Sequence, residues 1–270
     1  MNIEKKPFSC VRGGLTIRGT LYRRSGSDRL PGAIVSHEFM ANERSVAKYA
    51  RVLAEEGYAA FTYDFCGGCI VGRSDGRSKD MTVMTEVADL NAVMDAVQAH
   101  PDVAGGKLLL MGCSQGGFVS AITAARRRDE VEKLVLFYPA LSIPDDSRRG
   151  QMLTFRFDPV NIPEILGRVP ITLGRDYAAV AQKLDSFDLI AGYDGPVLLV
   201  HGTRDHLVPL SYSQRAAEVY GDRCTFVQMA GADHIFHGEN AEKAKALVRE
   251  FVRGRGEVCN LSNQAHAGAG

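Results

Sequence analysis

A serine, an aspartate and a histidine, far apart in the chain, each stand in a context that suits nucleophilic catalysis. Ser114 lies in "GCSQG", which fits the pattern G-x-S-x-G between an apolar run and a helix-like segment. Glycines two residues before and after a serine allow the sharp turn of a nucleophile elbow, which projects the hydroxyl at the end of a strand. The hydroxyl then needs a base and an orienting acid.

In this type of motif the partners follow in the order serine, acid, histidine. Asp205 comes after the apolar run "GPVLLVHG", and His234 comes after "CTFVQMAG", so both stand where predicted strands end. Loops at the carboxyl ends of parallel strands gather at one edge of a sheet, where sites form. We therefore expect Ser114 as nucleophile, His234 as base and Asp205 as its partner. The competing residues nearby are His206, Asp233 and His237.

Two backbone amides should stabilise the negative charge that develops on a substrate carbonyl. One is the amide of Gln115, because it follows the nucleophile. The other is expected from the early loop "VSHEFMANE", where Phe39 and Glu38 are the candidates. His37 in the same loop is expected to be structural, since the order of the motif places the base late in the chain.

The elements around these residues predict an α/β fold with a mostly parallel sheet and helices on both faces. Residues 8–24 are expected to form an N-terminal hairpin around two glycines. Further strands are expected at 32–37, 58–65, 107–112, 132–140, 195–202 and 224–231, and helices at 45–57, 81–100, 117–128 and 240–254.

Residues 141–190 are rich in proline and break the alternation of strands and helices. A structureless loop of that length is improbable inside a compact domain. We expect a small inserted lid subdomain over one edge of the sheet, between two core parts at 1–140 and 191–254, with a flexible tail at 255–270. Phe155 and Phe157 in the insert either line an acyl pocket or form the insert's own small core.

Composition excludes several classes of protein. Lys+Arg and Asp+Glu number 32 each, so no basic excess argues for nucleic acid or an anionic membrane surface.

The first residues lack the apolar segment of a signal peptide, and no apolar run is long enough to cross a membrane, which predicts a cytoplasmic protein. The six cysteines are scattered and expected to be reduced. A homodimer is compatible with the sequence, although no segment argues for one.

The motif "CGGC", from Cys66 to Cys69, matches C-x-x-C. It stands in a glycine-rich loop rather than at the start of a helix, and no second cysteine pair completes a zinc set. We therefore expect neither redox nor metal function from the pair. Cys113 is expected to be a small buried residue that points away from the elbow.

Four stretches together resemble the α/β-hydrolase superfamily and, more narrowly, the bacterial feruloyl (cinnamoyl) esterases. They are "SHEFMANERSVAKYARVLAEEGYAAFTYDF", "CGGCIVGRSDGRSKDMTVMTEVADL", "GCSQGGFVSA", and "YDGPVLLVHGTRDHLVP" with "GADHIF". The resemblance implies the triad Ser114, His234 and Asp205, and oxyanion donors at the amides of Phe39 and Gln115. It also implies that the insert covers the site.

In such esterases an acidic residue and a tyrosine of the insert bind the phenolic hydroxyls of the substrate, and these positions match Asp146 and Tyr177. The chain departs from the family at Leu153, where relatives carry a glutamine, and at His37-Glu38-Phe39, where His-Gly-Phe is common. Both departures concern the acyl group, and neither touches the triad.

The sequence therefore predicts a serine carboxylesterase acting on small-molecule esters of hydroxycinnamic or similar aryl acids, without a metal or cofactor. An alternative keeps the triad but takes another acyl group, as a short-chain acyl, monoacylglycerol or thioester hydrolase or an acyltransferase. A non-catalytic binding protein is a third reading, because fold alone does not specify activity. Such binders commonly lose one triad residue, and here all three positions are filled.

Overall fold

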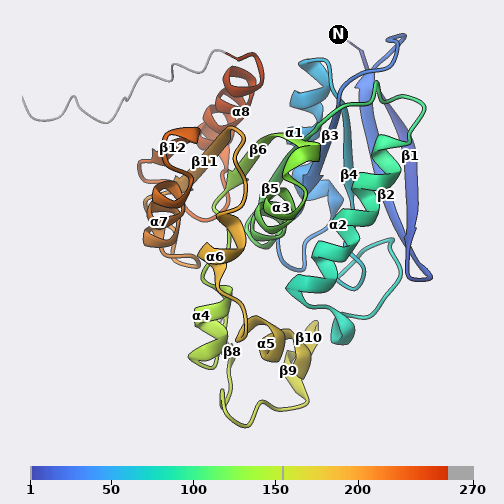
Figure 1. Ribbon diagram of the computed structural model, residues 1–270. Helices are drawn as coiled ribbons and strands as arrows, with labels where there is room; N and C mark the ends of the chain where they lie inside the picture. The colour runs from blue at the N-terminus through green and yellow to red at the C-terminus, as the bar shows by residue number, and fades with distance from the viewer. Residues whose placement is uncertain (1, 154, 255–270) are drawn as a thin grey trace, which may run out of the picture.

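The computed structural model describes residues 2–153 and 155–254, so the predicted tail at 255–270 lies outside the described residues. Its centre is a sheet of eight strands, of which the six from β4 to β12 pair in parallel (Figure 1). The strands, in spatial order, are β1(Ile3–Arg12), β2(Leu15–Arg24), β4(Ala59–Tyr63), β3(Gly32–Ser36), β5(Leu108–Cys113), β6(Val131–Phe137), β11(Val197–Gly202) and β12(Cys224–Met229). This confirms the predicted α/β class and the mostly parallel sheet.

The N-terminal hairpin is also confirmed. Strands β1 and β2 pair antiparallel from Ile3 opposite Arg24 to Arg12 opposite Leu15, and β2 then pairs antiparallel with β4. The turn between them holds Gly13 and Gly14, both with positive φ, which favours glycine because it has no Cβ.

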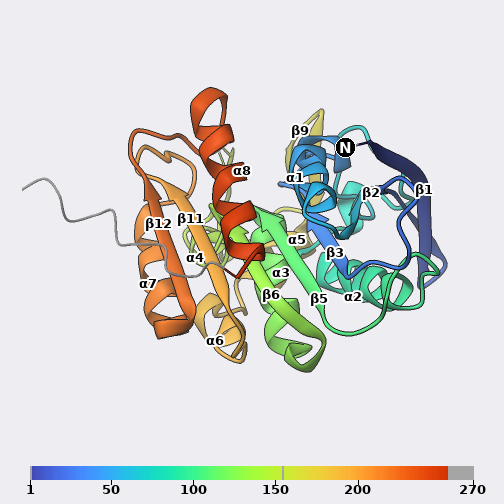
Figure 2. The same cartoon turned by 90° about the horizontal axis from the view of Figure 1, so that it is seen from above.

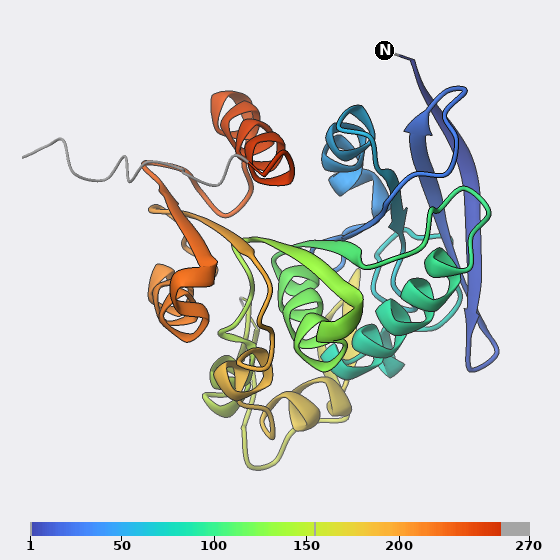
Figure 3. The same cartoon turned by 45° about the horizontal axis from the view of Figure 1, so that its top comes forward.

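Helices cover both faces of the sheet (Figures 2 and 3). One face carries α1(Glu43–Glu55) and α8(Gly238–Val252), whose apolar side chains share a core cluster with Val35, Met111 and Phe137 of the strands. The other face carries α2(Val83–Gln98), α3(Gln115–Arg126), α6(Ser186–Ile190) and α7(Leu210–Tyr220). The short helices η1(Ser78–Asp80), η2(Arg128–Glu130) and η3(Gly221–Arg223) directly precede α2, β6 and β12 in the chain. The two layers bury nearly every strand residue between β3 and β11, as the continuous apolar runs of those strands require.

Two differences from the sequence-based expectation concern the site. Helix α7 was not predicted, although Gly221, whose φ is 60°, caps its C-terminal end, and it buries Ala216 and Tyr220 four residues apart. Helix α3 begins at Gln115 rather than at Gly117, so its first amides directly follow Ser114.

The predicted insert holds α4(Ile143–Arg148), two small sheets and α5(Arg175–Ala181) before the chain returns to the core. The sheets pair β7(Gln151–Met152) with β8(Phe155–Arg156), and β9(Ile165–Arg168) with β10(Ile171–Gly174). Its last segment, α6, buries Phe187 and Ile190 in the core cluster beside α3 and α7. Within Figure 1 the insert lies below the sheet, apart from the helices of both faces.

A third core cluster joins the insert to the main domain. It combines Met40 and Met81 of the main domain with buried residues of the insert, namely Met152, Leu166, Leu173, Tyr177 and Ala178. Phe155 and Phe157 pack against this cluster, so they belong to the insert's own core. None of the described helices has the length and apolar character needed to cross a membrane.

Candidate active site

Ser114 stands at a sharp turn between β5 and α3, with backbone angles of φ 52° and ψ −120°. A residue with a side chain is strained there by about 1–3 kcal/mol. A Cβ at Gly112 would lie 2.2 Å from the carbonyl oxygen of Gly116, and one at Gly116 would lie 2.3 Å from that of His37. The turn therefore requires glycine at both positions, and the G-x-S-x-G pattern has a steric cause.

The structure brings Ser114, His234 and Asp205 into one chain of hydrogen bonds. His234 Nε2 lies 2.9 Å from Ser114 Oγ, and His234 Nδ1 lies 2.6 Å from Asp205 Oδ2. Because the carboxylate accepts the Nδ1 proton, Nε2 keeps its lone pair and accepts from the serine hydroxyl. This arrangement can remove a proton from Ser114 as its oxygen attacks a carbonyl carbon.

Asp205 is enclosed by donors. Its side chain has no exposed surface, and its Oδ1 accepts from the amides of Leu207 and Val208 at 2.9 Å each. Burial alone would raise its pKa, but hydrogen bonds from His201 and His234 outweigh burial and lower the pKa below its ordinary value. The carboxylate is therefore charged when His234 needs a partner.

His201 was not singled out from the sequence. It is fully buried, its Nδ1 lies 2.7 Å from Ser213 Oγ, and its Nε2 lies 3.0 Å from Asp205 Oδ2 and 3.1 Å from the carbonyl oxygen of Val208. Since both Nε2 neighbours are acceptors, Nε2 carries the proton and Ser213 donates to Nδ1. Asp205 Oδ2 thus accepts from two imidazoles, one on each side.

Glu38 does not line the pocket beside Ser114 but contacts Tyr138, which packs against His234. It is buried, and its carboxylate accepts from Ser45 Oγ at 2.5 Å and from Tyr138 Oη at 3.2 Å. The Tyr138 ring packs against the His234 ring with centroids 4.7 Å apart. Glu38 therefore fixes the aromatic ring that supports the histidine.

The amides of Phe39 and Gln115 are free to bind a ligand. Across residues 2–153 and 155–254, neither amide donates to a protein carbonyl or side chain. Phe39 and Gln115 line the same pocket as Ser114, and Gln115 opens α3, where the helix dipole favours negative charge. Such a pair of donors can hold an oxyanion.

The side chain of Gln115 links the main domain to the insert. Its Nε2 donates to Glu86 Oε2 at 2.7 Å, and its Oε1 accepts from Tyr177 Oη at 2.6 Å. Glu86 is buried in α2, and burial raises the pKa of its carboxyl well above the ordinary value. Burial likewise raises the pKa of the Tyr177 hydroxyl, which stays protonated and donates. Glu86 was also missed from the sequence.

A pocket of about 270 Å³ opens beside Ser114 and is walled on one side by the insert. Asp146, Tyr177 and Leu153 all line it, as does His206, whereas Asp233 and His237 do not. The apolar wall consists of Phe39, Ala140, Ile143, Met152, Leu153, Leu207, Val208 and Pro209. Asp146 accepts from Ser142 Oγ at 2.7 Å and pairs with Arg149 at 2.5 Å, so a polar patch lies within an apolar hollow.

The remaining residues of the sequence analysis have structural surroundings. Cys113 is buried in the core cluster on the α1 and α8 face of the sheet. His37 is fully buried, and its Nδ1 donates to the carbonyl oxygen of Glu38 at 2.7 Å.

Comparison with known proteins identifies a family and several related esterases. A family model described as serine aminopeptidase, S33, matches residues 33–173, just over half of the chain. A pimeloyl-[acyl-carrier protein] methyl ester esterase of Neisseria meningitidis is 28% identical over 200 residues, covering 62% of this chain and 76% of that protein.

Among solved structures, Est1E from Butyrivibrio proteoclasticus with bound ferulic acid superposes with a TM-score of 0.84 at 30% identity, covering 91% of this chain and 98% of that one. The structure of DcsB in complex with its substrate analogue has a TM-score of 0.73 at 20% identity, which shows the shared fold alone.

The raised pKa of Glu86 leads to a prediction about stability. The folded state holds a proton on Glu86 at pH values where the unfolded chain has lost it, so stability should fall as pH rises above about 4.3. Glu86→Gln replaces the protonated carboxyl with a neutral group that still accepts from Gln115. We expect this variant to lose less stability than the wild type between pH 5 and pH 8, as measured by urea unfolding. The exposed Glu250→Gln should follow the wild type within about 0.5 kcal/mol, and identical slopes in all three proteins would contradict a protonated Glu86.

Proposed function

Given that the chain belongs to the serine aminopeptidase S33 family and is an α/β hydrolase related to esterases, we propose that it is a serine carboxylesterase for hydroxycinnamate (feruloyl or cinnamoyl) esters. The observation that carries the proposal is the continuous hydrogen-bond chain from Ser114 through His234 to Asp205 at the wall of the pocket. A chain of this kind serves to activate a hydroxyl for acyl transfer.

The proposed reaction runs in two halves. His234 Nε2 takes the proton of Ser114 as Oγ bonds to the ester carbonyl carbon, and the amides of Phe39 and Gln115 hold the oxyanion. The carbon–oxygen bond to the alcohol then breaks, and His234 returns the proton to the leaving oxygen. Water, deprotonated by His234, attacks the acyl-enzyme and releases the acid. Asp205 keeps the imidazole oriented and stabilises its charged form.

The acyl half of the substrate is inferred from the pocket and from the likeness to Est1E, which binds ferulic acid. Pockets for drug-sized ligands hold about 300–1,000 Å³, so a hollow of about 270 Å³ suits a smaller group such as one aryl acid. The apolar wall can cover a ring. Asp146 retains lone pairs that can accept a phenolic proton, while Tyr177 can only accept, because its own proton goes to Gln115.

The first test is release of ferulate from ethyl ferulate by the purified protein, with p-nitrophenyl butyrate in parallel. We expect Ser114→Ala to lose several orders of magnitude in rate, about 10⁴-fold or more, because the acyl-enzyme cannot form. Ser9→Ala, on the exposed side of β1, serves as a matched control and should keep full activity.

The two assays distinguish the hydroxycinnamate esterase from its alternatives. Turnover of butyrate alone would keep the triad and move the substrate to short acyl groups. Turnover of neither ester would contradict the esterase proposal, as would a Ser114→Ala variant with activity near the wild type.

The role of Asp146 predicts a difference between two substrates. Asp146→Asn should raise the KM for ethyl ferulate about tenfold, because a charge-assisted hydrogen bond to the phenol is worth about 1.5–3 kcal/mol. Ethyl cinnamate has no phenolic hydroxyl, so its KM should change little. Steady-state kinetics with both esters tests this, and an equal change for both would show that Asp146 only supports the insert.

The contact of His201 with Asp205 predicts a change in pH dependence. His201→Leu removes a donor from the carboxylate, so Asp205 should stabilise protonated His234 more strongly and move the acid limb of kcat to higher pH. We expect kcat on p-nitrophenyl butyrate to fall about tenfold to 100-fold with little change in KM. His201→Gln, which can still donate, should partly restore the profile, whereas a purely structural role would lower stability and leave the limb in place.

A further inference from the structure

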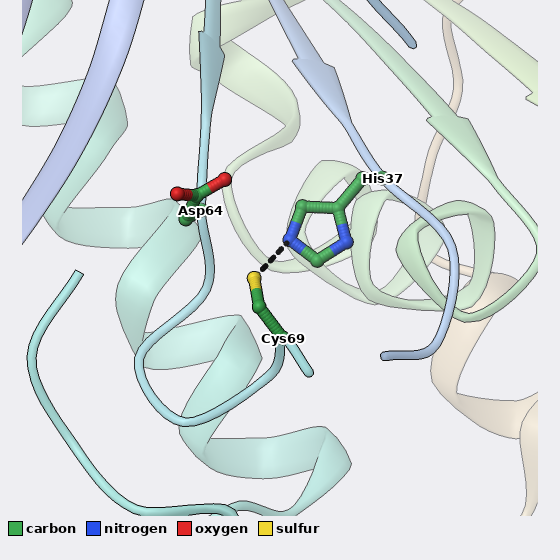
Figure 4. Close-up of side chains that lie close together, drawn as sticks. All are labelled: His37, Asp64 and Cys69. Atoms are coloured by element: carbon green, nitrogen blue, oxygen red, sulfur yellow. Dashed lines mark hydrogen bonds between the residues drawn. The ribbon is translucent and has the colours of Figure 1, made fainter. Parts of the chain in front are cut away.

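The two cysteines of the "CGGC" motif lie in different surroundings. Cys66 is buried in the core cluster under the sheet, and its amide donates to Asp89 Oδ2 at 2.8 Å. Cys69, three residues later, lies beside His37 and Asp64, with its Sγ 3.4 Å from His37 Nε2 (Figure 4). The motif therefore separates one core thiol from one thiol in a polar cluster.

The cluster consists of three potential metal ligands from different parts of the chain. His37 Nε2, Cys69 Sγ and a carboxylate oxygen of Asp64 all lie within 4.8 Å of one another. His37 Nδ1 donates to the carbonyl oxygen of Glu38, so Nε2 carries the lone pair, which accepts from the Phe65 amide and lies beside Cys69 Sγ. A carbonyl on the far nitrogen is the usual support for an imidazole that binds a metal ion.

The donor set and its spacing suit zinc. Zn²⁺ takes thiolate, imidazole and carboxylate ligands, with bonds of about 2.3 Å to sulfur and 2.0–2.1 Å to nitrogen. In tetrahedral geometry these bonds separate sulfur and nitrogen by about 3.5 Å, close to the 3.4 Å between Cys69 Sγ and His37 Nε2. Thiolate and carboxylate together would balance the charge of the ion.

An ion can reach the cluster from one side. His37 and Asp64 are fully buried, whereas Cys69 is partly exposed and lines a surface hollow of about 250 Å³ with Gly67, Gly72 and Ser74. Water in that hollow can supply the fourth ligand of a tetrahedral ion. Binding would release the Cys69 proton and displace the Phe65 amide, which donates to His37 Nε2 at 3.2 Å. Asp64 keeps its own position through the amides of Glu43 and Arg73.

The cluster is joined directly to the loop that carries Phe39. The Ile70 amide donates to the carbonyl oxygen of Met40 at 3.2 Å, so the Cys69 loop pairs with the residue after Phe39. The His37 carbonyl lies against Gly116, where even a methyl group would clash. Because the ion would take the Nε2 lone pair from the Phe65 amide, and because the His37 carbonyl is packed against Gly116, binding would strain the backbone around both proposed oxyanion amides.

We propose that His37, Asp64 and Cys69 form a binding site for one zinc-like divalent cation, and that its occupancy lowers the esterase activity. The binding half stands on the cluster alone. The inhibitory half rests on the function proposed above, since it acts through the oxyanion loop.

The binding test uses Co²⁺ as a spectroscopic probe on the metal-free full chain. Titration should give a thiolate-to-metal charge-transfer band that saturates at one equivalent, and Zn²⁺ should displace it. Cys69→Ser should lose the band and bind Zn²⁺ at least tenfold more weakly by calorimetry. Cys66→Ala is the matched control from the same motif and should keep the band, and Cys10→Ser replaces it if the core variant does not fold. Absence of the band in the wild type, or an equal band in Cys69→Ser, would overturn the site.

The activity test adds Zn²⁺ to the same three proteins with p-nitrophenyl butyrate. We expect at least a fivefold loss of rate in the wild type and in the control, reversed by EDTA, and no loss in Cys69→Ser. Zinc binding without loss of rate would overturn the inhibitory half. The absorption band is measured without substrate. A protein that hydrolyses neither ester would therefore contradict the proposed function and leave the test of the metal site unaffected.

Discussion

The geometry of the site depends on one strained residue. Ser114 adopts φ 52° because its amide donates to Phe137 of the neighbouring strand and its carbonyl accepts from Ala140, each at 2.9 Å. The turn is tight enough to press Gly116 against the backbone of the β3 loop. That contact sets the distance between the two loops that provide the free amides. The strain is therefore offset by the sheet, and the same close packing that forces it also builds the pocket wall.

Around this turn the polar groups form two connected layers. His234 contacts Ser114, but its orientation comes from Asp205 at one nitrogen and from the Tyr138 ring at its face. Those two groups are fixed in turn by His201 and Glu38, both buried. A buried carboxylate without partners would be costly, and here Glu38 accepts from two hydroxyls and Asp205 from two amides and two imidazoles. The buried residues His201 and Glu38 thus hold the groups that orient the imidazole, so its position does not depend on a surface loop alone.

Sequence reasoning could find the residues whose chemistry is local and could not find those whose role is tertiary. The spacing of its glycines indicates the elbow, and apolar runs indicate the buried parallel strands. The fold and the positions of Ser114, Asp205 and His234 could therefore be predicted from short stretches of sequence. Glu86 looks like an ordinary acidic residue of a helix, and only its contact with Gln115, 29 positions away, gives it a role. Helix α7 was missed because its buried residues, Ser213, Ala216 and Tyr220, do not form an apolar stripe, although Ser213 lies within hydrogen-bond distance of His201.

Gln115 connects the elbow to the insert through its side chain. Gln115 lines the pocket beside Ser114, and its side chain is held between Glu86 of the main domain and Tyr177 of the insert. A movement of the insert that breaks the Tyr177 contact must therefore reach the residue that carries one proposed oxyanion donor. Because these three side chains are buried and bonded to one another, they favour one arrangement of insert and elbow over intermediate ones. In the proposed reaction, an acyl group that holds the insert in place through Asp146 would therefore also hold the proposed oxyanion amide of Gln115. Binding far from the ester bond would in this way contribute to the reaction at that bond.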